Sequence, residues 1–309
     1  MSGRRCAVNN APSPTFFTES PEWGWFIVVY FFLGGIAGGL AFLGALLDLF
    51  GRQEDRRTSR IAHLIAAPLV VICLLLLVVD LNRPERFWRM MFRLDDDVLQ
   101  IMFKYWSPIS FGAWGVGIFG LVASLLFVGV LAETGTLPRG LAFLRRGGLG
   151  TVLTAISGLL GLFTAGYTGI LLASTNRPLW ADTTLLGLLF LLSGVSAAAA
   201  VLMLVGHRRA HPGTVRWLGW MDTTSSLLEL AVLAIIALTV WSVVQEVLDG
   251  GWGILLIVGT ILLGILIPVV LHWRPRLLGS LTVPSAALLV IAGSFVLRTV
   301  VVLASERAT

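Results

Sequence analysis

Residues 23–47 read WGWFIVVYFFLGGIAGGLAFLGALL, a stretch without a single Asp, Glu, Lys or Arg. A helix needs about 20 mostly apolar residues to cross the hydrocarbon core of a bilayer, and this stretch is long enough to do so. Six further charge-free runs follow, and an eighth is interrupted only by Glu229. The eight runs are 23–47, 61–79, 105–132, 147–176, 183–206, 223–245, 250–273 and 277–297. We therefore expect an all-α membrane protein with eight transmembrane helices.

The composition agrees with this expectation, because 57% of the 309 residues are hydrophobic and only 13% are charged. In soluble domains about a quarter of the residues are charged. The runs are continuously apolar rather than alternating, which excludes a transmembrane β-barrel. Short loops indicate antiparallel neighbours, and we expect two four-helix bundles, 23–176 and 177–309. Residues 1–22 are polar and lack the apolar core of a signal peptide, so the first span is expected to be retained.

The arginines predict the orientation of the chain. Twelve lie in the loops after the first, third, fifth and seventh spans, and nine basic residues lie on the opposite face. Five of those nine fall in one segment, 80–106. Positive charge favours the cytoplasmic side, so both termini are expected to face outward. The basic residues are scattered through short loops, which argues against binding of nucleic acid.

The segment 80–106 contains an unusual mixture of basic and aromatic residues. Arg86, Arg89 and Arg93 are at helical spacing, with Trp88 and other apolar residues between them. This pattern predicts an amphipathic helix that lies in the outer interface. The helix could anchor to lipid headgroups, or its arginines and Trp88 could form a docking surface for a partner.

Polar residues gather at the outer ends of the first five spans, where we expect a binding pocket. Trp and Tyr are also common at this depth as interface anchors, so each single residue has a structural alternative. Tyr30 and Tyr167 lie deeper than such anchors usually do. Asp80 and Arg83 have the i,i+3 spacing of a helix-surface ion pair. The outer-end residues are Glu22, Trp23, Trp25, Tyr30, Asp80, Asn82, Arg83, Tyr105, Trp106, Ser107, Ser110, Tyr167, Thr168, Ser174, Asn176, Arg177, Trp180 and Asp182.

Charged residues within a span are costly and need a reason. Glu229 is expected a third of the way into the sixth span from the inner face, and Arg298 in the outer half of the eighth. Either a proton path or an interhelical ion pair would account for them, although the second half offers few other polar groups at mid-depth. The glycines at positions 34, 35, 38, 39, 158, 161, 166 and 169 are expected to allow close packing of helices.

Resident metal centres are not expected. All four histidines lie at or near inner span ends, so the paired intramembrane histidines of a haem site are missing. The two cysteines are too few for an iron–sulfur cluster, and no metal-ligand spacing or phosphate-binding loop occurs. Any redox chemistry must use a diffusible cofactor or the centres of a partner.

Five motifs together resemble the NrfD/PsrC family, the membrane subunits of polysulfide reductase-like molybdoenzyme complexes. They are PEWGWFIVVYFFLGGIAGGLAF (21–42), DLNRPERFW (80–88), SPISFGAWG (107–115), GYTGILLASTNRPLW (166–180) and GSFVLRTVVV (293–302). The resemblance extends over residues 20–303.

The resemblance implies a haem-free subunit in the bacterial inner membrane that binds menaquinone or ubiquinone. It also implies a docked iron–sulfur subunit, which connects to a molybdopterin catalytic subunit. Tyr167 matches a tyrosine that hydrogen-bonds a quinone oxygen, and Asp80 with Arg83 matches a charged pair that closes the second span. Where some members have Asn and His before the first span, this protein has Glu19 and Glu22.

On this basis we expect Tyr167 to donate a hydrogen bond to the quinone, with Tyr30, Glu22 and Asn176 beside it. Glu22 or Asp80 would accept a proton, because a partly desolvated carboxylate suits that role. Two other functions stay open. Glu229 and Arg298 would serve a proton- or ion-translocating subunit without a redox site, and a passive anchor for a peripheral enzyme would need no pocket.

Overall fold

A computed structural model describes residues 23–81, 83–95, 98–175, 180–206, 210–248, 251–274 and 279–304. Within these residues, eight helical segments are long and apolar enough to cross a membrane, which confirms the expected fold class. They are α1 (Trp25–Leu49), α2 (Arg56–Val79), α3 (Pro108–Thr134), α4 (Gly147–Ala173), α5 (Leu186–Gly206), α6 (Pro212–Thr239), the composite of α8 (Gly251–Ile254), η5 (Leu255–Leu266) and α9 (Ile267–Trp273), and α10 (Thr282–Ala304).

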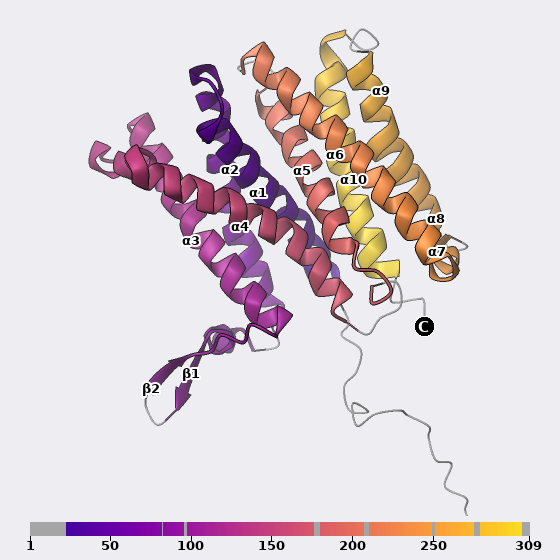
Figure 1. The fold of residues 1–309 in the computed structure, drawn as a ribbon, viewed down its shortest axis with the longest axis horizontal. Coiled ribbons are helices and arrows are strands. Elements are labelled where there is room, and N and C mark those ends of the chain that lie inside the picture. Colours follow the sequence, from indigo (N-terminus) through magenta and orange to yellow (C-terminus); the bar gives the residue numbers. More distant parts are fainter. Residues whose placement is uncertain are drawn as a thin grey trace, which may run out of the picture.

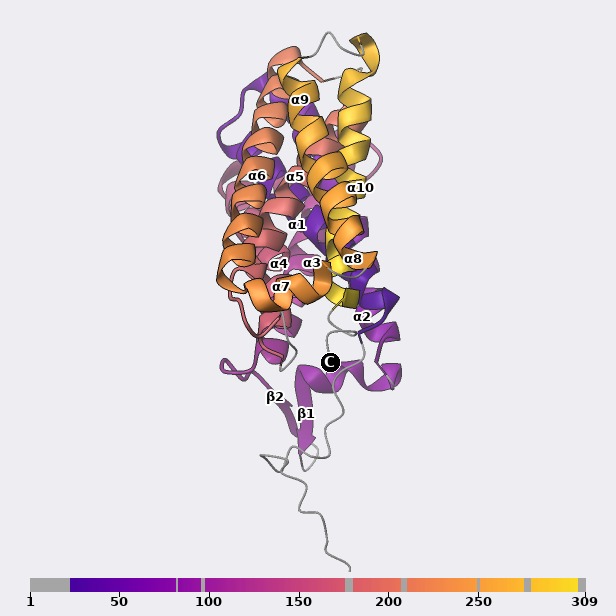
Figure 2. The same cartoon turned by 90° about the vertical axis from the view of Figure 1, so that its right-hand side faces the viewer.

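The helices alternate in direction, so the two ends of the molecule differ (Figure 1). One end carries the start of α1, the end of α10 and a β-hairpin of β1 (Phe92–Asp95) and β2 (Val98–Ile101); we call it the hairpin face. The hairpin projects beyond the helix ends (Figure 2). The opposite end carries the loops with most of the arginines, and we call it the arginine face. Its short helices are η2 (Gln53–Asp55), η4 (Arg139–Arg145) and η6 (Gly279–Leu281).

Helices α1 and α5 lie at the centre of the bundle. α1 packs against α2, α4, α5 and α10, and α5 packs against α1, α4, α6 and α10. α5 therefore contacts both halves of the protein, and the division into two four-helix bundles at residue 177 stays a prediction.

Glycines bring the backbones of α1, α4 and α5 into direct contact. A Cβ at Gly38 would lie 2.3 Å from the carbonyl oxygen of Gly161, and a Cβ at Gly39 would lie 2.5 Å from that of Gly194. Small residues are the usual means by which helices approach closely in lipid. The predicted packing role is confirmed for Gly38, Gly39 and Gly161.

The sixth transmembrane helix begins earlier than the expected span 223–245. Pro212 is its first residue, and the ring of His211 accepts a hydrogen bond from the backbone N–H of Gly213. The charge of Asp222 does not end the helix, because its carboxylate is buried and accepts a hydrogen bond from Ser196 on α5. The placement of Glu229 was therefore wrong, since it lies 17 residues from the start of α6 and 10 from its end. Glu229 is in the half of the bundle nearer the hairpin face.

The segment 80–106 is not the single amphipathic helix that its spacing predicts. Pro84–Met90 forms a short 3₁₀-helix, η3, and the hairpin follows. Arg86 and Arg89 lie on η3, whereas Arg93 lies on β1. The indole N–H of Trp114 on α3 donates to the carbonyl of Met102 at 3.1 Å and so holds the base of the hairpin. The contact with α3 stabilises the hairpin in place of a helix, and the spacing of the arginines along the sequence does not reveal it.

Replacement of Gly38 by alanine is expected to lower the stability of the protein by about 1–3 kcal/mol, because the methyl group would overlap Gly161 and force α1 and α4 apart. Thermal unfolding in detergent measures this. Gly117→Ala is the matched control, since its Cβ would meet only the methyl group of Met91 at 3.6 Å. Equal midpoints for the two variants would contradict the packing argument.

Candidate functional site

An apolar cavity of about 160 Å³ lies among the first four helices, near the hairpin face. It includes Tyr30 from α1 and Tyr167 from α4, so two of the three tyrosines of the protein share one cavity. We call it the tyrosine cavity. An apolar pocket with a few converging polar groups is the usual form of a small-molecule site.

Tyr167 is held rigidly at one wall of this cavity. Its hydroxyl donates a hydrogen bond of 2.8 Å to the carbonyl oxygen of Pro108, and its ring stacks on Phe163 at 5.3 Å. A Cβ at Gly112 would lie 1.9 Å from the tyrosine oxygen, so only glycine leaves room for the ring. Because its proton is used by Pro108, Tyr167 presents an acceptor to the cavity in this structure rather than the predicted donor.

Tyr30 has the opposite hydrogen-bonding state. Tyr30 is 2% exposed, and its hydroxyl has no hydrogen-bond partner among the described residues. The oxygen nevertheless lies against the cavity rather than in a sealed core, since it is not among the fully enclosed, unpaired side-chain atoms of the described residues. A buried hydroxyl without a partner is costly. Tyr30 therefore offers a ligand in the cavity both a free donor and a free acceptor.

The η3 helix covers the cavity on the hairpin face. Phe87, Met90 and Met91 line it from this side, while Leu81 lines it at the end of α2. Methionine side chains are flexible and adapt to irregular shapes. The segment expected to anchor or dock is thus also the lid of the tyrosine cavity.

The predicted pair of Asp80 and Arg83 does not form. Asp80 caps the C-terminal end of α2 and Arg83 directly precedes η3, and both side chains are exposed without an ion pair between them. The spacing argument fails because the helix ends at Val79. Partial burial nevertheless raises the pKa of the Asp80 carboxyl above its ordinary value. Glu22 and Asn176, the other expected members of the site, lie outside the described residues.

The proposed docking residues are on the outside of η3 and the hairpin. Arg86, Arg89 and Arg93 are exposed, and the guanidinium of Arg89 lies 5.4 Å from the ring centre of Trp88. Arg86 lies 3.7 Å from Glu85, an exposed pair of little energetic weight. These side chains form a basic surface on the hairpin face, in the segment that also lines the tyrosine cavity.

Arg298 on α10 is fully buried between α1 and α5. Its guanidinium donates to the carbonyls of Phe31 and Phe190 at 3.0 and 3.2 Å, and to the hydroxyls of Ser193 and Ser294 at 3.1 and 2.6 Å. A Cβ at Gly35 would lie 2.5 Å from this guanidinium. Gly35 was expected to allow close packing of helices, and in the structure it makes room for the charged side chain of Arg298.

Glu229 belongs to the same buried group but does not form a direct ion pair with Arg298 within the described structure. Its carboxyl lies beside Ser193, which accepts a hydrogen bond from Arg298. Ser193, Ser196, Thr260 and Ser294 line a small void with it. The two charges are thus connected through a serine rather than in contact.

The polar group continues toward the arginine face. Ser196 donates to Asp222 and lies 3.1 Å from the hydroxyl of Ser226, and Asp222 lies 3.4 Å from the ring of His272. We call the series the polar track; it comprises His272, Asp222, Ser226, Ser196, Glu229, Ser193, Ser294 and Arg298. The expectation of few polar groups in the second half was therefore wrong.

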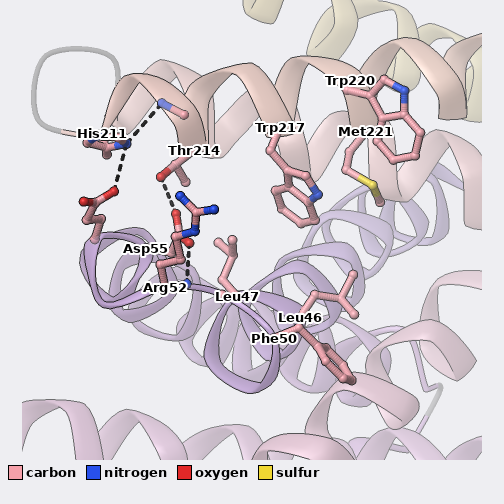
Figure 3. A pocket seen from close by; sticks show the side chains of 13 residues that line it. Leu46, Leu47, Phe50, Arg52, Asp55, His211, Thr214, Trp217, Trp220 and Met221 are labelled. Atoms are coloured by element: carbon pink, nitrogen blue, oxygen red, sulfur yellow. Dashed lines mark hydrogen bonds and ion pairs between the residues drawn. The ribbon is translucent and has the colours of Figure 1, made fainter.

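A third hollow, of about 690 Å³, lies on the arginine face between the end of α1 and the start of α6 (Figure 3). Thr214 donates to Asp55, and His211 lies 3.3 Å from Glu54, so polar groups of the two halves meet at its rim. Trp217 and Phe50 line its apolar part. Both acidic side chains and the histidine have partners, Glu54 with His211 and Asp55 with Thr214, which distinguishes this hollow from the tyrosine cavity.

Comparison with known proteins identifies the family. The model of the family described as "Polysulphide reductase, NrfD" matches residues 14–307, nearly the whole sequence. The chain belongs to the NrfD family.

Individual relatives are distant. Protein NrfD of Escherichia coli (strain K12) is 30% identical over 206 residues, which is 61% of each sequence. A polysulfide reductase chain of Wolinella succinogenes is 27% identical over 192 residues, 60% of this protein and 58% of that one. The chain therefore spans about three-fifths of the length of these two relatives. The NrfD homolog of Haemophilus influenzae is 23% identical over 82% of this protein and 84% of its own length.

In this NrfD-family protein, reasoning from charge-free runs missed Asp222 and the serines of the track. A signal was present, because Asp222, Ser226 and Glu229 have i, i+4 and i+7 spacing on α6. Ser193 and Ser196 on α5 are three residues apart. Each helix thus carries a polar stripe on one face. That these stripes face one another is a property of the tertiary structure.

Coupling between Gly112 and Tyr167 tests the construction of the cavity. Gly112→Ala is expected to lower the free energy of unfolding by about 1–3 kcal/mol, because the new methyl group overlaps the tyrosine ring. In a Tyr167→Ala background the same change should cost little, so the two effects are strongly non-additive. Thermal unfolding of the four proteins measures the coupling, and an equal cost in both backgrounds would refute the contact.

Proposed function

We propose that this protein is the membrane subunit of an oxidoreductase complex of the bacterial inner membrane and that its tyrosine cavity binds menaquinone or ubiquinone. Two relatives support the role as a subunit, since one is named as a chain of polysulfide reductase and the other as a subunit of selenate reductase. The unpartnered hydroxyl of Tyr30 in an apolar cavity is the observation that carries the assignment to a quinone.

The cavity suits the ring of a quinone better than a larger ligand. Pockets for drug-sized molecules usually have volumes of about 300–1,000 Å³, whereas this one has about 160 Å³. A flat ring with two oxygens matches its apolar walls and its two hydroxyls. The isoprenoid tail would then lie outside the cavity, in lipid.

The two tyrosines have complementary roles in this proposal. The free O–H of Tyr30 donates to a quinone carbonyl, while the oxygen of Tyr167 accepts from a quinol hydroxyl. Oxidation of a bound quinol would release two electrons to the docked partner and two protons, one to Asp80 and the other to water at the hairpin face. Asp80, which adjoins the cavity residue Leu81 and has a raised pKa, is positioned to accept a proton near the hairpin face. Arg83 would favour the charged form of Asp80 if the pair closed.

An iron–sulfur subunit is the partner that this arrangement favours, with a molybdopterin subunit beyond it. It would dock on Arg86, Arg89, Arg93 and Trp88, directly above the cavity lid. A partner at this surface is placed to receive electrons from the ring without any metal centre in the membrane protein itself. The exposed arginines would steer an acidic partner surface toward the lid.

Tyr30→Phe is expected to weaken the binding of a short-tailed naphthoquinone by about three- to tenfold, because a hydrogen bond contributes about 0.5–1.5 kcal/mol. The full-length protein in nanodiscs can be titrated with this quinone, with tryptophan fluorescence as the signal. Tyr105→Phe is the matched control, since this third tyrosine is 75% exposed and lies outside the cavity. If both Tyr30→Phe and Tyr167→Phe bound the quinone as tightly as the parent protein, the cavity would not be the quinone site.

We infer a second function, proton transfer, from the polar track. Its groups are buried except for the half-buried His272, and it extends from His272 near the arginine face to Arg298, whose Nε donates to the carbonyl of Phe31. Phe31 adjoins Tyr30, so the track ends one residue from the tyrosine cavity. Intramembrane ionisable residues in such a series are typical of proton relays. Glu229, Asp222 and His272 are the members that can gain and lose a proton.

Proton movement can be followed with a pH-sensitive dye inside liposomes that contain the complete complex. Glu229→Gln and Asp222→Asn are each expected to reduce the protons moved per electron severalfold, because an amide cannot exchange a proton, while quinol oxidation continues. The control is Glu54→Gln on the exposed arginine face. Unchanged proton movement in both track variants would mean that the track is structural.

A further inference from the structure

A polar cavity of about 350 Å³ opens on the arginine face, away from the tyrosine cavity and the polar track. It lies between the ends of α1 and α3 and the starts of α2 and α4. Four arginines line it, Arg56, Arg60, Arg145 and Arg146, and we call it the arginine cavity. Its only acidic lining residues within the described part of the protein are Asp48 and Glu133.

Both carboxylates are already neutralised by other cations. Asp48 accepts from Arg145 and lies 3.0 Å from the ring of His63. Glu133 accepts from Arg60 at 3.0 Å and from Arg145 at 3.5 Å. Arg145 and Arg60 thus account for the two negative charges.

The other two arginines of the cavity, Arg56 and Arg146, have no carboxylate partner among the described residues. Neither has an ion pair among the residues that the structure describes, and both side chains line the cavity. The cavity therefore carries two uncompensated guanidinium groups. Guanidinium binds phosphate and carboxylate oxygens with two parallel hydrogen bonds, so the missing partner is an anion.

The start of α4 adds hydrogen-bond donors to the same cavity. This helix of 27 residues begins at Gly147; the side chain of Arg146 does not cap it, and its first turn holds no acidic residue. The first N–H groups of a helix have no partner within the helix and favour negative charge. Gly150 allows η4 to pack closely here, because a Cβ at that position would lie 2.2 Å from the backbone of Arg145.

Thr154 provides an independent sign of a missing ligand. It is 4% exposed and lines the arginine cavity from the second turn of α4. Its hydroxyl has no hydrogen-bond partner in the described part of the sequence, and its oxygen is not fully enclosed by protein atoms. A buried polar group of this kind needs a partner from outside the protein.

The surroundings indicate that the anion belongs to a lipid. On the same turns of α4, Leu149 and Val152 are 49% and 53% exposed and are apolar. In a spanning helix such side chains face acyl chains. The cavity thus lies where a headgroup would be when its acyl tails contact α4, and basic pockets at this depth are typical of anionic lipid sites.

We propose that the arginine cavity binds the phosphate of an anionic phospholipid, with Arg56 and Arg146 on its oxygens and the start of α4 and Thr154 as further donors. A lipid held there would connect α2 to α4 on the side opposite the tyrosine cavity. The lipid site does not depend on quinone binding, so an experiment can refute one proposal without refuting the other.

Native mass spectrometry of the full-length protein, titrated with phosphatidylglycerol, counts bound lipids and measures their affinity. Arg56→Gln and Arg146→Gln are each expected to weaken the tightest site by about fivefold, since an arginine near a lipid phosphate contributes about 1 kcal/mol. The matched control is Arg57→Gln, because Arg57 is the exposed neighbour of Arg56 and does not line the cavity. All variants change exposed arginines, and thermal unfolding without added lipid checks their folding.

Two further titrations distinguish the source of the phosphate. Phosphatidylcholine, whose headgroup is neutral overall, should bind at least tenfold more weakly than phosphatidylglycerol, and inorganic phosphate at millimolar concentration should not displace the lipid. Efficient displacement by inorganic phosphate would assign the cavity to a free anion and overturn the lipid assignment. Equal lipid affinity in Arg56→Gln, Arg146→Gln and the Arg57→Gln control would overturn the site itself.

Discussion

The guanidinium of Arg298 donates hydrogen bonds to main-chain carbonyls of α1 and α5 and to serines of α5 and α10. Removal of a charged group from water is expensive, and within lipid every donor must find its acceptor in the protein. The three helices can satisfy this residue only if they meet at one point, and Gly35 must lack a side group there. This constraint fixes the position of α1, which carries Tyr30 into the tyrosine cavity.

The rest of the first half builds on that placement. Glycine contacts set how closely α1 packs against α4 and α5. On α3, Gly112 leaves the space that the ring of Tyr167 occupies. The two hydroxyls then differ only through their neighbours, because the carbonyl of Pro108 accepts a hydrogen bond from Tyr167, whereas no described group accepts one from Tyr30. A site with one free hydroxyl, that of Tyr30, and one hydroxyl that can only accept, that of Tyr167, therefore arises from backbone packing rather than from an unusual residue.

The two faces of the molecule have different chemistry, and the same physical requirement explains both. On the hairpin face the charges are exposed on and around η3, and η3 shields an apolar cavity. On the arginine face the charges are many, and the buried carboxylates are paired across helices: Arg145 donates to Asp48 and Glu133, and Arg60 donates to Glu133. Arg56 and Arg146 differ from the other exposed arginines of this face because they line a cavity whose carboxylates are already paired, and this combination indicates a ligand.

Length and apolarity alone determined the eight crossings, because the hydrocarbon core requires about 20 apolar residues whatever they pack against. The placement of Tyr30 and Tyr167 near one face followed from counting residues along each span. The charge criterion failed at Asp222, where a serine of another helix satisfies the carboxylate, and helical spacing failed at Arg93, where Trp114 and Met102 stabilise a hairpin. The partners of Glu229, Arg298 and Thr154 come from distant parts of the sequence or from outside it. Only tertiary structure decides such contacts, because the hydrogen-bond partner of a polar group buried in the membrane comes from whichever helix packs against it.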